Sequence, residues 1–272
     1  MIVISDKLQQ NRKIYKLPIS KIFMTQLELR DFTPMAEDEK LVALPNIPEG
    51  NYASAWARAY NAEVNKRFNG NTNLIPSEDF SGMNTFKALL VDEMAQRVYN
   101  GTMRVALPRH LDDRVLALIR NKFYTTTPAL VFRDSAEVWE GNKPLVRELT
   151  KHVEQAHGKI PKYALVTGLK VEPWPEDEAD YKLKVLPTTE FKVVESDVLS
   201  PKFNQWYFST TDENGIPNNL NREKQGKEDR QWFTSNQRVS WFGLYSDAGL
   251  DASGGDLACS YGLGRVVFVS GG

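Results

Sequence analysis

The stretch Trp241–Gly264 reads WFGLYSDAGLDASGGDLACSYGLG, and the chain then passes through Arg265–Val269 (RVVFV) to a final Ser-Gly-Gly. Small apolar residues recur along the stretch: Leu244, Ala248, Leu250, Ala252, Leu257 and Ala258. Tyrosine, serine, aspartate and glycine fill the positions between them. Tyrosine and tryptophan give contact area at low entropy cost, whereas the small polar residues adapt to many surfaces. The mixture is typical of a binding surface held on a fixed apolar frame.

The run Arg265–Val269 is rich in β-branched and aromatic residues. Such a run predicts a strand that is buried on both faces. Upstream, Gly254-Gly255 is a turn signal between two short strand-like segments. The stretch is therefore also compatible with the ordinary loop-rich end of an α+β domain.

Composition places the chain among globular proteins. It has 272 residues, of which 41% are hydrophobic and 25% charged, enough for one large domain or two ordinary ones. The net charge of -1 gives no electrostatic reason to expect nucleic acid or an anionic membrane as a partner. The single cysteine, Cys259, excludes a disulfide within the chain.

No targeting or membrane segment is expected. The apolar start Met1–Ile4 is ended by Asp6 and Lys7 before a signal-peptide core forms. Eighteen consecutive apolar residues occur nowhere, so no membrane insertion is predicted. The localisation stays open, and carriage on a virus particle is one route to a cell surface.

The first half of the chain predicts helices at Asn51–Gly70, Asn84–Gly101, Leu111–Phe123 and Pro144–Gly158, with a strand at 129–132. After Ile160 strands dominate, with candidates at Tyr163–Val171, Tyr181–Leu186 and Phe191–Val194. This shift predicts a boundary between a mixed region, 1–159, and a second domain, 160–272. A single mixed domain would give the same pattern.

Local motifs for catalysis or metal binding are weak. His152 and His157 lie five residues apart, which does not place two ligands on one helix face. Phosphate-binding loops, G-x-S-x-G elbows and a CxxC partner for Cys259 do not occur. The acidic run Glu176–Asp180 lacks EF-hand spacing, and a solvated turn is favoured over a calcium site. We expect no catalytic residue, metal or cofactor.

The ending of the chain resembles a known family. Leu257-Ala258-Cys259-Ser260 and Gly264–Gly271, together with the upstream Leu244 and Leu250, resemble the variable regions of diversity-generating retroelement target proteins. In such systems template adenines are copied with errors, so set positions take many residue types. The resemblance implies an α+β chain with a C-type-lectin-like fold over 160–272. Its variable region would span about 241–264, and residues 1–159 would be a mixed, helix-containing region of unknown role.

The resemblance also implies which positions bind ligand. The displayed set comprises Gly243, Tyr245, Asp247, Gly249, Asp251, Ser253, Gly254, Asp256, Cys259, Tyr261 and Leu263. Trp241 belongs either to this set or to the frame, because an asparagine codon mutated only at its adenines cannot become a tryptophan codon. Cys259 is then one variable position and needs no catalytic explanation.

We therefore expect a non-enzymatic protein that binds a protein or cell-surface ligand without a metal. Two alternatives stay open. One is an enzyme on the related fold of the formylglycine-generating enzymes, although these rely on cysteine or copper chemistry that one cysteine does not supply. A pocket with convergent titratable residues near Cys259 would favour it. The other is a virion structural subunit with contacts in its N-terminal half. The ligand, host and oligomeric state are not specified.

Overall fold

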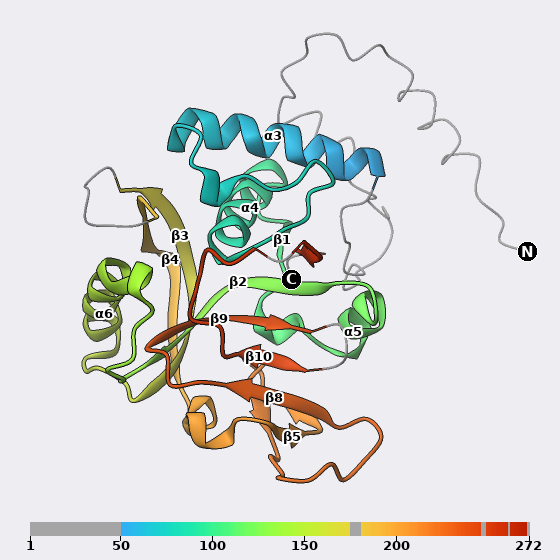
Figure 1. Ribbon diagram of the computed structural model, residues 1–272, viewed down its shortest axis with the longest axis vertical. Helices are drawn as coiled ribbons and strands as arrows, with labels where there is room; N and C mark the ends of the chain where they lie inside the picture. Colours follow the sequence, from blue (N-terminus) through green and yellow to red (C-terminus); the bar gives the residue numbers. More distant parts are fainter. Residues whose placement is uncertain (1–49, 175–180, 246–248, 261, 271–272) are drawn as a thin grey trace, which may run out of the picture.

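A computed structural model describes residues 50–174, 181–245, 249–260 and 262–270 (Figure 1). The architecture of this part is α+β, as the sequence predicts: helices pack around a twisted, mainly antiparallel sheet. None of the helices within these ranges is both long and apolar enough to cross a membrane.

Each of the four predicted helices forms. Their bounds are α3 Gly50–Phe68, α4 Thr85–Val98, α5 Asp113–Ile119 and α6 Lys143–His157. Short 3-10 turns are η2 Thr72–Leu74, η3 Pro108–His110, η4 Glu140–Asn142, η5 Asp197–Leu199 and η6 Pro201–Phe203. Asn84 caps α4, since its side chain accepts a hydrogen bond from the Lys87 backbone N–H. Gly158 ends α6 in the left-handed conformation, at φ 78°.

The strands lie mainly in the second half of the chain. They are β1 Met103–Val105, β2 Tyr124–Arg133, β3 Tyr163–Pro173, β4 Leu183–Glu195, β5 Trp206–Phe208, β6 Thr210–Thr211, β7 Pro217–Asn218, β8 Arg230–Thr234, β9 Val239–Leu244, β10 Leu250–Ala252, β11 Gly264–Arg265 and β12 Phe268–Ser270. The eight-stranded main sheet has the order β4-β3-β2-β9-β10-β8-β5, with β11 paired to β2. Neighbours are antiparallel except at β10–β8 and β11–β2.

The two short strands predicted at 181–186 and 191–194 join into the single strand β4. Its register against β3 shifts between Thr167 and Leu169. Gly168 lies at this irregularity with φ 69°, and a Cβ there would overlap the Glu190 backbone. The close approach of the two backbones therefore requires glycine, and it interrupts the alternation that the sequence shows.

The expected boundary at residue 160 falls in the connection between α6 and β3. Strand β2, from the first region, nevertheless lies between β3 and β9 of the second. One hydrophobic cluster contains Trp56 and Leu90 from the first region together with Trp241 and Phe268 from the second. The two regions thus share one sheet and one core.

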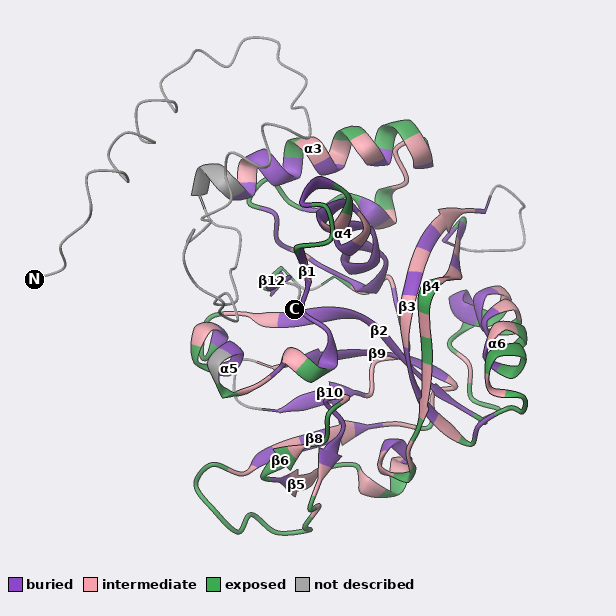
Figure 2. Cartoon of the chain, turned by 180° about the vertical axis from the view of Figure 1, so that it is seen from behind, coloured by how far each residue is buried: buried purple, intermediate pink, exposed green. Residues whose placement is uncertain are grey.

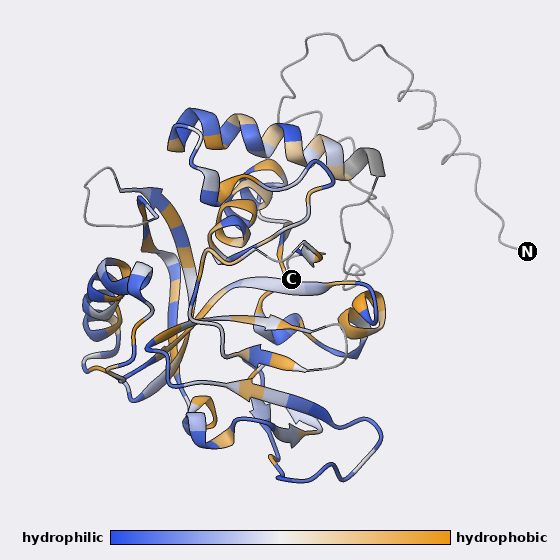
Figure 3. Cartoon of the chain, viewed as in Figure 1, coloured by the Kyte–Doolittle hydropathy of each residue, from blue (hydrophilic) through white to orange (hydrophobic). Residues whose placement is uncertain are grey.

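The central strands of the sheet are buried on both faces. Alternate residues of β2 enter different clusters, Leu130 and Phe132 one, Ala129 and Val131 the other. Figure 2 shows β2 and β9 coloured mostly as buried, and Figure 3 shows α4, with both hydrophobic and hydrophilic residues, above the sheet.

The sequence predicts that Arg265–Val269 is one buried strand. The burial is confirmed, but the segment is not one continuous strand. Residues 266–269 are at most 7% exposed and alternate between the two clusters. The segment is divided, however: β11 pairs in parallel with β2, whereas β12 pairs antiparallel with β1. The chain changes partners between these strands, which apolar pattern alone does not reveal.

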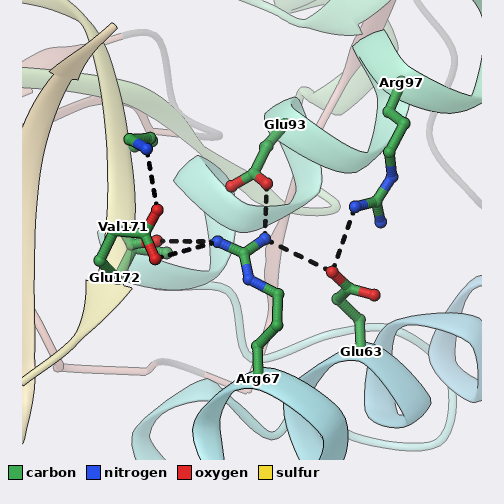
Figure 4. A network of polar contacts seen from close by, with 7 residues as sticks. Glu63, Arg67, Glu93, Arg97, Val171 and Glu172 are labelled. Atoms are coloured by element: carbon green, nitrogen blue, oxygen red, sulfur yellow. Dashed lines mark hydrogen bonds and ion pairs between the residues drawn. The ribbon is translucent and has the colours of Figure 1, made fainter.

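Polar contacts fix α3 against its neighbours (Figure 4). Arg67 on α3 donates through Nη1 to Glu93 on α4 at 2.5 Å and to Glu63 at 3.4 Å. Its Nη2 donates to Glu172 on β3 at 3.4 Å. Arg97 on α4 donates to the same Glu63 oxygen at 3.2 Å. One arginine therefore connects α3, α4 and β3.

Candidate ligand-binding face and adjoining pocket

The apolar frame of the 241–264 stretch is buried as predicted. Leu244, Leu250, Ala252 and Leu257 are each at most 1% exposed. Ala258 is half-buried and packs against the larger cluster. Ala248 lies outside the described residues. Strands β9 and β10 carry most of this frame into the sheet.

The displayed set separates into groups. The buried members are Gly243, Gly249 and Asp251, and Trp241 joins them at 7% exposure. The half-buried members are Tyr245, Ser253, Gly254, Asp256 and Cys259, and Leu263 is 62% exposed. Asp247 and Tyr261 lie outside the described residues. The surface-reaching positions therefore concentrate in 253–263, and the expectation of outward display differs from the structure at the buried positions.

Four aromatic rings gather beneath this face. Tyr245 lies at their centre, with ring centroids 6.3 Å from Tyr124, 6.1 Å from Phe233 and 6.1 Å from Trp241. Phe233 and Trp241 meet Tyr245 edge-on, a favourable geometry for aromatic pairs. Tyr245 is thus part of the packing that supports the face.

The glycines of the stretch accommodate these rings. A Cβ at Gly249 would lie 2.6 Å from Cε2 of Phe233. A Cβ at Gly254 or Gly243 would overlap the Trp241 indole. These positions need glycine because an aromatic ring occupies the space of a side chain. The sequence pattern alone suggests flexibility or variation at the same positions.

Asp251 lies in the core near a buried arginine. Arg133, at the end of β2, is 0% exposed. Its five N–H groups donate to the carbonyl oxygens of Leu199, Gln237 and Ala252 and to the hydroxyls of Ser240 and Thr234. All five guanidinium donors are therefore satisfied. This residue joins β2, β8, β9, β10 and η5.

Burial opposes both charges of this pair. It lowers the pKa of Arg133 to about 10, while the charge of Asp251 acts in the opposite direction. Burial also raises the pKa of Asp251, against hydrogen bonds from Ser253 and Tyr245 and the attraction of Arg133. Each charge thus compensates the other in the core. The sequence signal for this pair is a charged residue directly after the apolar run 129–132.

A small pocket adjoins the face at the N-terminus of α4. It is lined by Met83, Asn84, Thr85, Tyr124, Thr126, Trp241, Asp256, Leu257 and Cys259. Asp256 is held in place, since its Oδ1 accepts from the Tyr181 hydroxyl and from the Ala258 N–H, each at 3.0 Å. Thr85 is 2% exposed, and its hydroxyl has no hydrogen-bond partner among the described residues.

A lysine and a serine meet beside this pocket. Lys87 is 3% exposed, and its Nζ donates to the Gly82 carbonyl at 2.7 Å and to Ser260 Oγ at 2.9 Å. Asn84 Nδ2 donates to the same Ser260 Oγ at 3.1 Å. Burial lowers the pKa of Lys87 to about 8. The sequence motifs miss this contact because its residues are 173 positions apart.

No three His, Cys, Asp or Glu side chains converge on a metal-sized site within the ranges that the structure covers. His157 Nε2 contacts Glu195 at 3.2 Å, and His110 Nδ1 accepts from the Leu107 N–H at 3.0 Å. The acidic run Glu176–Asp180 lies outside the described residues.

Comparison with known proteins assigns no family. Protein-family models, curated proteins and solved structures were all searched, and none matches this chain.

Proposed function

We propose that this chain is a ligand-binding protein whose C-terminal face carries the variable residues of a diversity-generating retroelement target, on a C-type-lectin-like domain. One observation carries the proposal. The apolar positions Leu244, Leu250 and Leu257 are buried, while intervening positions such as Ser253, Cys259 and Leu263 reach the surface. A constant frame with varied positions between its members needs this separation.

The expected ligand is a protein or a cell-surface structure. Leu263 is one of the few large apolar side chains that the described part of the chain exposes, at 62%. An exposed apolar side chain adds contact area to an interface with a protein partner. Recognition would depend mainly on the surface-reaching positions in 253–263, since Gly243, Gly249 and Asp251 are occupied in packing.

The decisive test is the DNA around the coding sequence. We expect a near-copy of the 241–264 coding stretch, rich in AAC or AAT codons, beside a reverse transcriptase gene. Sequencing of populations should then show substitutions confined to template adenines. A locus without such a copy, or with substitutions spread evenly along the chain, would reject the retroelement proposal.

Binding is tested with two matched libraries displayed on yeast. The first randomises Ser253, Cys259 and Leu263, and the second randomises the buried Gly243, Gly249 and Asp251. Most members of the first library should display as protease-resistant protein and yield binders to immobilised cell-surface proteins. Most members of the second should be lost to proteolysis. Equal survival of both libraries, or no binder from the first, would count against the proposed face.

A further inference from the structure

The contact between Lys87 and Ser260 brings together two groups that perform chemistry in other settings. Ser260 is an exposed residue, and its hydroxyl donates to the Ala258 carbonyl oxygen at 3.3 Å. Lys87 is almost fully buried and lies 2.9 Å from that hydroxyl. A serine becomes nucleophilic when an adjacent base removes its proton, and a desolvated lysine is one such base.

The surroundings of Lys87 favour its neutral form. Within the described part of the chain, no carboxylate forms an ion pair with its Nζ, and burial is the cause of its lowered pKa. The residue is also in the first turn of α4, where the helix dipole disfavours a positive charge. The neutral amine accepts a proton, which the ammonium does not. Lysine bases of this kind operate near pH 7–8.

The geometry orients both partners. The Gly82 carbonyl accepts from Lys87 Nζ at 2.7 Å and so fixes the end of a flexible side chain. Asn84 Nδ2 donates to Ser260 Oγ at 3.1 Å, which stabilises negative charge as the hydroxyl loses its proton. Asn84 is itself held by its role as the cap of α4.

The adjoining pocket has no room for an acyl group, so an ester would meet the exposed Ser260 from the solvent side. Asn84 lines the pocket, and so does Cys259, the residue before Ser260. Its volume is about 10 Å³, which is room for about one water molecule. Met83, Trp241 and Leu257 give it apolar walls, and the unpartnered hydroxyl of Thr85 gives it a hydrogen-bond donor.

We propose that Ser260 and Lys87 form a nucleophile and general-base pair that takes the acyl group of an ester reaching Ser260 from the solvent. Lys87 Nζ removes the proton of Ser260, Oγ bonds to the carbonyl carbon, and the ester C–O bond breaks. The lysine ammonium returns its proton to the departing alcohol. Water then attacks the acyl carbon while Lys87 takes a proton from it, and Ser260 Oγ leaves and recovers that proton. The net reaction converts ester and water into acid and alcohol.

The first test labels the full chain with a fluorophosphonate, which a nucleophilic serine attacks with loss of fluoride. Intact-mass and peptide mass spectrometry should find one adduct per chain, on Ser260. Ser260→Ala should abolish it, whereas Ser209→Ala, at an exposed serine after β5, should not. An unlabelled wild-type chain, or adducts spread over several serines, would overturn the proposal without relying on any variant to fold.

The second test measures the base. Lys87→Met should slow labelling and hydrolysis of p-nitrophenyl acetate at pH 8 at least tenfold, and Lys87→Arg should not restore them because arginine stays protonated. Lys151→Met, at a lysine whose side chain is 65% exposed, is the matched control and should react at the wild-type rate. Circular dichroism checks that each variant is folded. If folded Lys87→Met is labelled as fast as the wild type, Lys87 is not the base. Its contact with Ser260 would then only hold the C-terminal segment in place.

Discussion

Residues of the 241–264 stretch have one of two roles, display at the surface or packing in the core. Residue type alone does not distinguish these roles. Gly243, Gly249 and Gly254 face aromatic rings, and Asp251 faces the charge of Arg133. Glycine and aspartate are equally common on adaptable surfaces and in tight packing. Burial, not residue type, therefore decides which positions of the stretch are free to vary.

Gly254→Ala tests this distinction. The added methyl group would overlap the Trp241 indole, so the ring or the backbone must move. Overpacking of this kind costs about 1–3 kcal/mol in the free energy of unfolding. Gly262→Ala is the control, because nothing lies within 4 Å of its Cβ position. Urea denaturation of both variants should separate them. Equal stability would mean that the indole yields without cost.

Lys87 predicts a pH dependence of stability. Its pKa is about 8 in the folded chain, below the ordinary lysine value of 10.5, because the side chain is buried. Between these values the unfolded chain binds more protons, so the contribution of Lys87 to stability rises with pH from about 8 to about 10.5. The difference in unfolding free energy between wild type and Lys87→Met should therefore increase over this window in denaturant titrations. A difference that is constant across the window would place the lysine in a solvated environment.

The local sequence pattern predicts helices and strands correctly where that pattern extends over many residues. Helix α4 has its cap at Asn84 and a nearly continuous buried surface, and α6 ends at a left-handed glycine. Short segments behave differently: β11 and β12 are two and three residues long and owe their existence to β2 and β1. Pairing partners that are distant in sequence define such strands.

The position of α3 depends on Arg67. Arg67→Met removes the donors to Glu93, Glu63 and Glu172. Partly exposed ion pairs are worth about 0.2–1 kcal/mol each, so amide exchange of α3 should accelerate several-fold with little change in the sheet. Lys66→Met, at the exposed neighbouring residue, should leave exchange unchanged. Hydrogen–deuterium exchange mass spectrometry measures the exchange of α3 in both variants. Unaltered α3 exchange in Arg67→Met would contradict the role of the Arg67 ion pairs.

The whole molecule is organised around β2. This strand lies between β3 and β9, so it joins the helical first region to the strand-rich second region. Arg133 at its end binds four segments of the second region. The sheet is therefore incomplete without residues that precede 160.

A fragment of residues 160–272 should accordingly fail to fold. Without β2, strands β3 and β9 lose their common neighbour and expose unpaired edges and apolar faces. Residues 50–272 should give a dispersed amide spectrum by NMR and one cooperative thermal transition. The shorter fragment should give neither. A well-dispersed spectrum from 160–272 would instead support two independent domains.

The sequence by itself determined the α+β class, the main helices, the buried frame and the burial of Arg265–Val269, because these depend on periodicity within a few turns or strands. Tertiary structure alone decided which residues of the displayed set reach the surface. It also decided the partners of Arg133 and the meeting of Lys87 with Ser260. These contacts join residues up to 173 positions apart, and local pattern carries no information on which distant side chain will fill a given space. The 241–264 stretch is thus partly a surface and partly the packing that supports it.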